Sequence, residues 1–537
     1  MALCCLSRPA LKGAQMAIYS VGDLSRREIL KMSATLAGSR VLLSTGSAGA
    51  AQPEGQLTWG VHVSLAPAWF DPAETSAGSV IPFMVMYAVH DAMVKAMPGQ
   101  PMAPSLAESW TASEDALTYE FVLRKGAKFH NGDDVTAEDV KFSFERYRGS
   151  ERRMLHDRVA AVETPDPQRI RFRLRQPWPD FFTFYVEVSG AGWIVSKKYV
   201  ESVGEESFKK APMGAGPYRF VSFTPGQELT LEAFDQYWRK TPSVKRLVFK
   251  VIPDEATRLV ALKRGEVDII YLIRGELAEE LARTKGLTLK PVVTKGTFWL
   301  YFADQWDPRS PWHDQRVRRA ASLAIDYETL NQALTLGHSK ITGSIIPNIF
   351  EYYWQPPVPT YDPATAKRLL AEAGYPKGFD AGEYNCDSSY ADLAEAVLNN
   401  LQQVGIRTKL RPLERAAFFK GYAEKTLKNL IQGQSGAFGN AATRLDAFVV
   451  KGGAYVYGNY PDIDALFEQQ ANELDRTRRG AILHKIQELV YERAIYAPIW
   501  RQSAINGAGP RVGESGLGLI AAHPYSSPYE DVTLAGK

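Results

Sequence analysis

The sequence predicts an α/β protein with more than one domain or lobe and with β-rich insertions. The chain has 537 residues, which is long enough to bury several cores. Segments in which apolar and polar residues alternate predict strands with one buried face, and a strand–helix–strand unit over residues 247–270 predicts a parallel sheet. Hydrophobic residues make up 45% and charged residues 23% of the chain, which excludes a wholly disordered protein.

Residues 1–51 have the layout of an export signal. Ser-Arg-Arg-x-Ile-Leu-Lys at residues 25–31 resembles the bacterial twin-arginine motif, and a weakly apolar stretch and an Ala-x-Ala site at 48–50 follow it. The alternative is an amphipathic helix that carries two arginines by chance. Because Arg40 interrupts the apolar run, the segment is too short and too polar to span a membrane. We expect residues 1–51 to be removed on export to the periplasm, with Met16 as an alternative start.

Charge and cysteine content narrow the range of partners. The formal net charge is +3, and it would be about −1 without residues 1–51. Neither value indicates a nucleic acid or an anionic membrane as a partner. Cys4 and Cys5 lie in the signal-like segment, so Cys386 would remain as a single thiol that cannot form an internal disulfide.

The first element with a clear pattern is a strand, a turn and a capped helix. Residues 117–124 alternate as a half-buried strand, and His130 begins an Asn-Gly turn. Thr136 followed by Asp139 is a capping-box pattern that opens a helix. Metal binding or acid–base catalysis is the alternative role for the four acids at residues 133–139. Since the regular spacing of a calcium loop is lacking, capping is the favoured interpretation.

The next strands and helix are predicted from the same signals, apolar–polar alternation and helix capping. Residues 169–175 alternate apolar residues with arginines, which predicts a strand with a solvated face, although a phosphate site is the alternative. A strand at 247–252 precedes Asp254, which should cap a helix that ends at Gly265, and residues 267–270 return as a strand.

Helical patterns dominate the final third of the chain. In residues 361–376, Asp362 is the predicted cap, Pro363 occupies the first helical position, and Gly374 lies past the end. Two further helices are predicted around residues 461–475 and 478–493.

The sequence contains partial matches to several catalytic motifs, but none of these matches is complete. The stretches GQSGA at 433–437 and GESGL at 513–517 each lack the last glycine of a nucleophile elbow. GAGPYR at 214–219 departs from a dinucleotide-binding loop, because its proline would disrupt the helix start. SFKK at 207–210 matches the pattern Ser-x-x-Lys, which is short enough to occur by chance in a chain of this length. We expect no enzyme, no cofactor and no metal site; the alternative is a secreted hydrolase that acts on peptides or esters.

Several segments, taken in order, resemble the extracytoplasmic solute-binding proteins of the peptide/nickel/opine class (family 5) that serve ABC importers. The strongest block contains the strand, turn and capped helix described above. The blocks are PSLAESWTASEDALTYEFVLRKGAKFHNGDDVTAEDVKFSFER (104–146), PMGAGPYRF (212–220), DQRVRRAASLAID (314–326), YDPATAKRLLAEAGYP (361–376) and residues 459–500.

The resemblance implies a two-lobed periplasmic binding protein with a hinge and an extra β-rich accessory domain. Lobe I would comprise residues 52–80, 212–295 and 500–537. The accessory domain would comprise 81–211, and lobe II would comprise 296–499.

The resemblance also points to three cleft regions: the loop after the first strand, the strand entering lobe II, and the ligand loop at 433–448. Each aromatic residue in them fits a core position as well as a cleft position. The candidate ligand-binding residues are Ser64, Trp69, Phe70, Trp299, Tyr301, Gln434, Ser435, Phe438, Asn440 and Arg444.

The implied mechanism is capture of a small-molecule solute by lobe closure, followed by delivery to ABC permease subunits, with the binding protein a monomer. Peptide-binding members of the family carry an aspartate that pairs with the peptide's α-amino group. Ala437 stands at that position, so we expect a polar, neutral or anionic solute such as an opine, a sugar derivative or a blocked peptide. The alternative is a shifted loop in which Asp446 takes the amine.

Overall fold

The computed structural model describes residues 52–75, 81–149 and 151–536; the signal-like segment 1–51 lies outside these ranges. Its main feature is one mixed sheet in the order β10-β11-β12-β1-β13-β19-β14-β18-β16-β17, with β15 paired to β19. The strands are β10 (Tyr218–Thr224), β11 (Glu228–Ala233), β12 (Val244–Val251), β1 (Glu54–Val61), β13 (Ile269–Ile270), β19 (Tyr496–Ala508), β14 (Thr288–Phe302), β18 (Leu430–Ser435), β16 (Phe379–Asp387), β17 (Ile406–Leu413) and β15 (Lys340–Ile341).

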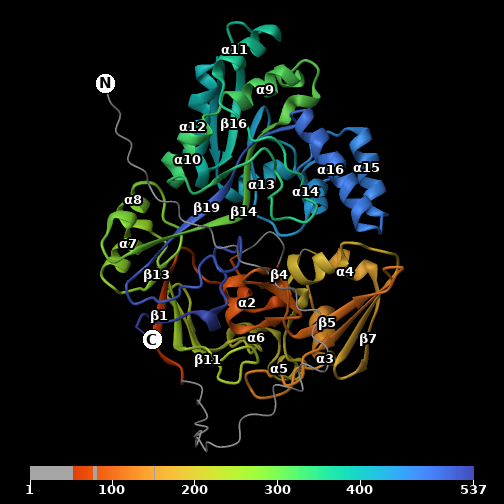
Figure 1. The fold of residues 1–537 in the computed structure, drawn as a ribbon, viewed down its shortest axis with the longest axis vertical. Helices are drawn as coiled ribbons and strands as arrows, with labels where there is room; N and C mark the ends of the chain where they lie inside the picture. The colour runs from red at the N-terminus through yellow and green to blue at the C-terminus, as the bar shows by residue number, and fades with distance from the viewer. Residues whose placement is uncertain (1–51, 76–80, 150, 537) are drawn as a thin grey trace, which may run out of the picture. The chain divides into compact units, whose positions relative to one another are not determined.

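Strands β14 and β19 connect the two halves of this sheet. They pair antiparallel from Thr288 opposite Ala508 to Tyr301 opposite Tyr496. At the start of β14, strand β19 pairs with β14 on one side and with the lobe I strand β13 on the other, whereas the end of β14 pairs with the lobe II strand β18. In Figure 1 the two long strands run between the group of elements that contains β1 and β13 and the group that contains β16. They are therefore the crossing segments of a two-lobed protein.

Lobe I is built from three separated parts of the chain. Strand β1 lies between β12 and β13 and is parallel to both, so the predicted strand–helix–strand unit is confirmed with β1 inserted between its strands. Asp254 caps the helix of that unit by accepting a hydrogen bond of 2.8 Å from Thr257 N. Residues after 508 pack into the same core, for example Tyr529, which is fully buried. The lobe I helices are α7 (Glu255–Lys263) and α8 (Gly275–Arg283).

The accessory domain has its own core beneath a four-stranded antiparallel sheet of order β5-β6-β8-β7. Two short strand pairs, β2–β9 and β3–β4, accompany it. Its strands are β2 (Asp91–Ala92), β3 (Val94–Met97), β4 (Gln100–Pro104), β5 (Ala107–Ala112), β6 (Thr118–Leu123), β7 (Val159–Asp166), β8 (Arg169–Leu174) and β9 (Trp193–Ile194). Its region contains helices α2 (Phe83–Val89), α3 (Ala137–Glu145), α4 (Arg152–Arg158), α5 (Lys197–Val203) and α6 (Glu205–Lys210). The fully buried helix α2 packs with the core of lobe I, close to the predicted domain boundary at 81.

Lobe II covers both faces of its part of the sheet. Phe298, Leu300 and Phe302 face one core, whereas Trp299 and Tyr301 face the other, as successive side chains of a strand do. The lobe II helices are α9 (Gln315–Leu323), α10 (Tyr327–Thr335), α11 (Pro363–Glu372), α12 (Ala391–Gln403), α13 (Arg415–Ala423), α14 (Ala441–Phe448), α15 (Pro461–Ala471) and α16 (Arg476–Glu492).

The acidic stretch at residues 133–139 caps a helix, as predicted. Asp139 Oδ2 accepts hydrogen bonds from Thr136 N at 2.9 Å and from Thr136 Oγ1 at 2.7 Å, which completes the capping box of α3. His130 is a turn residue that links two segments: its Nε2 lies 3.0 Å from Gly216 O, and Gly214 N donates to its Nδ1 at 3.3 Å. Burial lowers the pKa of His130 to about 3, so the imidazole is neutral at physiological pH.

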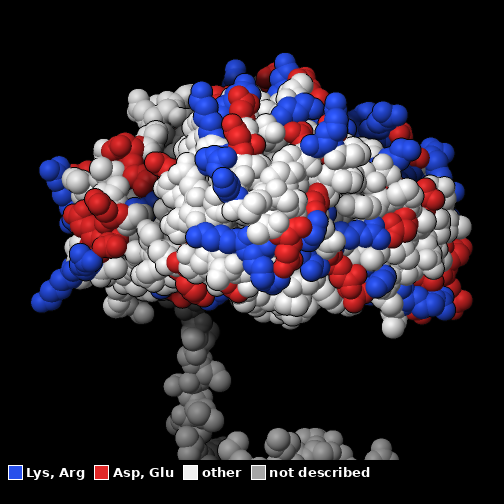
Figure 2. All heavy atoms as spheres, turned by 90° about the horizontal axis from the view of Figure 1, so that it is seen from above, with Lys and Arg blue, Asp and Glu red and all other residues white. Residues whose placement is uncertain are grey.

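Charged side chains of both signs mix on the surface. On the face displayed in Figure 2, lysines and arginines are interspersed with acids, as a net charge near zero predicts. The arginine stripe of β8 is matched by acids on neighbouring strands: Arg171 lies 2.7 Å from Glu120, and Arg173 lies 2.6 Å from Glu163. Within the described ranges, each helix is too short or too polar to cross a bilayer.

Close backbone contact explains the Gly-x-Gly of residues 214–216 and gives a test of the fold. A Cβ atom at Gly214 would lie 2.0 Å from Val89 O, whereas a Cβ atom at Gly509 would lie 3.4 Å from its nearest neighbour, Asp268 O. We expect Gly214→Ala to lower the free energy of unfolding by about 1–3 kcal/mol, as overpacking does, and Gly509→Ala to change it little. Urea unfolding measures both variants, and equal midpoints would contradict this account of the glycine.

Candidate functional site

The predicted ligand loop joins β18 to α14 and is held firmly at both ends. Strand β18 pairs with β14 from Thr297 opposite Ser435 onward. At the other end, Asn440 caps α14: its Oδ1 accepts from Thr443 N at 3.1 Å, and its own N–H donates to Thr443 Oγ1 at 3.1 Å. The residues between these anchors are therefore presented from a rigid frame.

Phe438 reaches from this loop of lobe II into the core of lobe I. Its ring centre lies 5.1 Å from that of Phe83 and 5.1 Å from that of His523. Lys295 Nζ lies 4.2 Å from the centre of the same ring, within the range of a cation–π contact. Phe438 is 4% exposed, so its burial depends on both lobes. This single aromatic side chain therefore couples the ligand loop to lobe I.

A second link joins lobe II to the accessory domain. Asp180 Oδ1 accepts a hydrogen bond of 2.7 Å from Asn440 Nδ2, and Asp180 Oδ2 accepts one of 2.7 Å from Arg479 Nη2. Asn440 and Arg479 are almost fully buried. Because both bonds converge on one carboxylate, the accessory domain contacts the helix cap of the ligand loop directly. We call the group Asp180, Asn440 and Arg479 the interlobe latch.

Arg444, on α14, is buried beneath the ligand loop. Its Nη1 donates to Thr297 Oγ1 at 2.8 Å and to Ile345 O at 2.9 Å, and its Nη2 lies 3.4 Å from Ala437 O. Within the described ranges, no carboxylate forms an ion pair with it. Burial lowers the pKa of Arg444 to about 9. The guanidinium thus remains largely charged at neutral pH while surrounded by neutral acceptors.

At the start of the ligand loop, Gln434 contacts the carboxylate of Asp387, which is already paired with Arg415. Gln434 Nε2 donates to Asp387 Oδ2 at 3.0 Å, and Arg415 Nη1 lies 2.6 Å from the same oxygen. Ser435 is half-buried, and its Oγ accepts from Ala437 N at 3.4 Å. The chemistry at this end of the loop is therefore neutral overall.

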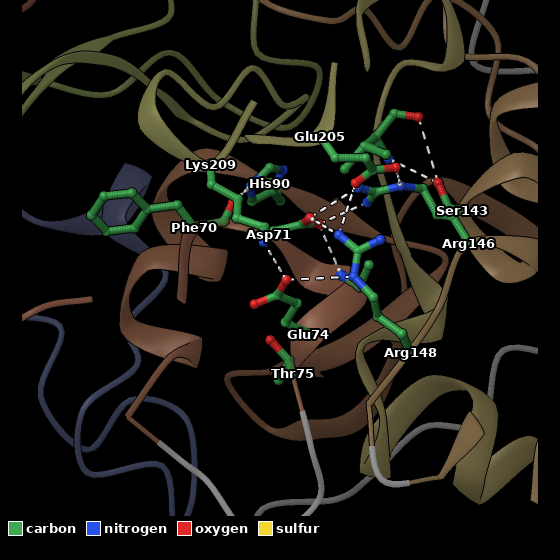
Figure 3. A network of polar contacts seen from close by, with 12 residues as sticks. Phe70, Asp71, Glu74, Thr75, His90, Ser143, Arg146, Arg148, Glu205 and Lys209 are labelled. Carbon is green, nitrogen blue, oxygen red and sulfur yellow. Dashed lines mark hydrogen bonds and ion pairs between the residues drawn. The ribbon is translucent and has the colours of Figure 1, made fainter. Parts of the chain in front are cut away.

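The loop after β1 is fixed by the ion-pair network of Figure 3. The buried carboxylate of Asp71 lies 2.7 Å from Arg146 Nη1 and 3.2 Å from Arg148 Nη2, and it also accepts from Ala73 N at 3.0 Å. Arg146 follows helix α3 of the accessory domain. The network therefore ties lobe I to the accessory domain at the end of this loop, and the two can move together.

The remaining predicted site residues divide between surface and core. Ser64 is exposed and Trp69 is half-buried, so both can reach a solute. Phe70, Trp299 and Tyr301 lie in hydrophobic cores with 0–1% exposure. This placement favours the core role that their patterns left open. Trp299 packs on Phe448 of the ligand-loop segment, with ring centres 5.1 Å apart, and the Arg444 guanidinium lies 5.9 Å from the same ring.

Sequence reasoning missed several residues that the structure adds to this region: Lys295, Asp180, Arg479, His523 and Phe350. Each comes from a different segment, and no local pattern marks it. A lysine at residue 295, inside a strand with many apolar residues and 6% exposed, is the one signal that could have been noticed.

The electrostatics of the region are dominated by cations. Burial, and next to it the charge of Lys295, lower the pKa of His523 to about 3, so this imidazole is neutral and cannot act as a cation or an acid at neutral pH. The residues described contain no cluster of histidine, cysteine and carboxylate groups suited to a metal ion. The polar side chains around the loop, among them Asn440 and Arg444, offer hydrogen-bond donors.

Known proteins share this organisation. The model of the bacterial extracellular solute-binding proteins, family 5 (middle region), matches residues 101–456. Heme-binding protein A of Haemophilus influenzae is 27% identical over 533 residues, which cover 90% of this chain and 96% of that protein.

Solved structures show the same fold. The ABC transporter substrate-binding protein CtaP from Listeria monocytogenes superposes with a TM-score of 0.78 at 22% identity, covering 90% of this chain and 100% of that one. PBP AgaA from A.tumefacien R10, solved with agropinic acid, gives a TM-score of 0.69 at 25% identity over 90% of this chain and 99% of that one. The predicted two-lobed α/β fold is confirmed, and the match to the family model extends over well more than half of the sequence. The chain belongs to the bacterial extracellular solute-binding proteins of family 5.

Proposed function

We propose that this protein is the periplasmic solute-binding component of an ABC importer and that it captures a small polar solute by closing lobe II onto lobe I and the accessory domain. The observation that carries the proposal is the ligand loop, whose Phe438 and Asn440 contact the opposite side. A solute that touches both sides stabilises the closed form by its differential affinity for that form. The membrane permease subunits then recognise closure, and the protein works as a monomer.

The solute class follows from the acids around the ligand loop. Ala437 occupies the position at which peptide-binding relatives carry the aspartate for a free amine. Asp387, Asp180 and Glu187 each pair with an arginine or lysine, and Asp446 is exposed. A buried ammonium group without a carboxylate partner is strongly disfavoured. We therefore propose a neutral or anionic polar solute, such as an opine, a sugar derivative or a blocked peptide.

The alternative, a secreted hydrolase of peptides or esters, gains no specific observation. The serines of the two incomplete elbow motifs, Ser435 and Ser515, each accept a hydrogen bond from the backbone amide two residues later. Neither bond activates a hydroxyl as a nucleophile, which requires a base positioned to take its proton.

The interlobe latch can be tested by removing its charge. Asp180→Asn keeps the shape of the side chain but weakens the charge-assisted bond to Arg479, which is worth about 1.5–3 kcal/mol. We expect solute affinity to fall about tenfold or more, and X-ray scattering to show less compaction at a fixed subsaturating solute concentration. Asp134→Asn, an exposed acid in the same domain, is the control and should change neither quantity. Unchanged affinity and compaction in Asp180→Asn would show that the latch does not stabilise closure.

Amine recognition can be tested by calorimetry. Free-amine di- and tripeptides and their N-acetylated forms are titrated into the full chain, and we expect no preference for the free amine. Ala437→Asp supplies the carboxylate that peptide-binding relatives use, and it should create a preference for the free amine. Micromolar binding by the unaltered protein that requires the free amine would refute the interpretation of Ala437.

Export can be tested in cells. Replacing Arg26 and Arg27 together by lysine should stop delivery by the twin-arginine route, because that route reads the arginine pair. Cell fractionation measures the periplasmic share of the protein. Undiminished delivery would exclude the twin-arginine route while leaving the binding function intact.

A further inference from the structure

Three buried cationic side chains from three elements meet at residues 345–350 of lobe II. Arg444 Nη1 lies 2.9 Å from Ile345 O, and Arg501 Nη1 donates to Asn348 Oδ1. Lys295, on β14, places its Nζ 5.9 Å from the centre of the Phe350 ring. The guanidinium of Arg444, on α14, lies 5.4 Å from the same centre. The exposed fractions of the three cationic residues are between 2% and 7%. We call Lys295, Arg444 and Arg501 the cationic cluster.

The cationic cluster carries more positive charge than its contacts balance. Lys295 pairs with Glu187 at 2.5 Å. In the ranges that the structure describes, neither Arg444 nor Arg501 has a carboxylate oxygen within 4.0 Å. Three cations therefore share one acid. Burial lowers the pKa of Arg501, with Tyr353 opposing it, and burial also lowers the pKa of Arg444; no carboxylate counters the effect on either group.

Two other buried arginines show what a purely structural arginine looks like in this protein. Arg258 donates to four backbone carbonyls, at 2.6–3.0 Å, and Arg318 also donates to four, at 2.7–2.9 Å. Arg444 has one hydroxyl, one close carbonyl and a long contact of 3.4 Å. Its hydrogen-bonding capacity is less well filled, and it lies in a group of like charges that repel one another.

An open groove lies beside the cationic cluster. It has a volume of about 640 Å³ and is lined by Asn348, which accepts from Arg501, and by Phe350, whose ring lies near Lys295 and Arg444; the three cations lie behind this lining. Tyr352, Tyr353 and His484 continue the same groove. The groove is large enough for a small solute, and it combines aromatic surface with donors.

We propose that the cationic cluster holds an anionic group of the transported solute, either a carboxylate or a phosphate. This inference rests on the proposed function and specifies the charge of its solute. An arginine presents parallel N–H donors that match the oxygens of either group, and a lysine adds a compact positive charge. Binding supplies the negative charge that three buried cations lack, and it links lobe II to both crossing strands.

The direct test uses small anions as probes. The full chain is freed of bound solute by unfolding and refolding, and it is titrated calorimetrically at constant ionic strength with succinate, inorganic phosphate and the neutral analogue succinamide. We expect saturable 1:1 binding of succinate or phosphate at least tenfold tighter than that of succinamide. Tighter binding of succinate indicates a carboxylate solute, and tighter binding of phosphate indicates a phosphorylated one. Equal or undetectable binding of all three probes overturns the proposal.

Two substitutions with opposite expected signs separate binding from structure. Arg444→Met should weaken binding of the anion at least tenfold, whereas Glu187→Gln removes the competing acid and should strengthen it about threefold or more. A purely structural role for the cluster predicts no gain from Glu187→Gln, so no gain overturns the proposal even if Arg444→Met fails to fold. Arg309→Met removes an exposed arginine outside the cluster and should leave anion affinity unchanged.

Solution scattering separates failure of this inference from failure of the proposed function. Compaction on addition of a neutral solute, without any preference for anions, keeps the binding function and rejects the cationic cluster as an anion site. If neither the solute recovered from the purified protein nor the probes cause compaction, both the function and the inference are rejected.

Discussion

The pairing of β14 with β19 is the constraint on which the rest of this structure depends. Both lobes are connected through the same two hydrogen-bonded strands. Motion of one lobe relative to the other therefore requires these strands to bend or twist without separating. Their register shifts between Val293 and Thr297 and again between Phe298 and Trp299. Such irregularities interrupt a ladder and let a strand bend locally. Lys295, a member of the cationic cluster proposed to hold an anion, lies within the first of these irregularities.

The contacts between the two sides differ in kind. Phe438 places apolar surface against the opposite core, which is favourable without fixing a direction. The interlobe latch is directional, because Asp180 must meet Asn440 and Arg479 at hydrogen-bond distance. The burial of Phe438 favours contact between the two sides, and the hydrogen bonds of Asp180 fix their relative orientation. Together the two contacts define one closed arrangement of the lobes. On the other side, the Asp71 network joins lobe I and the accessory domain, so they act as one partner.

Local elements could be predicted from the sequence because their causes are local. The cap of α3 by Thr136 and Asp139 depends on residues three apart, and the two-faced burial of β14 follows from strict alternation. The order of strands could not be predicted in this way, because the insertion of β1 between β12 and β13 depends on segments far apart in the chain. The family resemblance supplied that discontinuous plan.

Site residues were predictable to a lesser degree, for a physical reason. Phe438 and Asn440 lie on one loop and could be named together, but Asp180 meets Asn440 from a position 260 residues away in the sequence. Trp299 illustrates the opposite difficulty, since an aromatic residue in a strand has the same pattern whether it faces a core or a cleft. Charge balance around Arg444 is a property of space, and it becomes visible only when the neighbours in three dimensions are known.

The N-terminal and C-terminal parts of lobe I contact each other, which affects how lobe I folds during synthesis. Arg511 Nη2 donates to Gln56 O, and β13 pairs with residues 507–508 of β19. Strand β1, the first strand in the described part of the chain, is therefore synthesised long before the last segment that completes its sheet. At ordinary translation rates that interval is on the order of one minute. From the synthesis of β13 until that of β19, the edge of β13 that will pair with β19 has no partner, and such an edge can pair with other chains. The longer this half-built sheet persists, the longer that edge is open to aggregation.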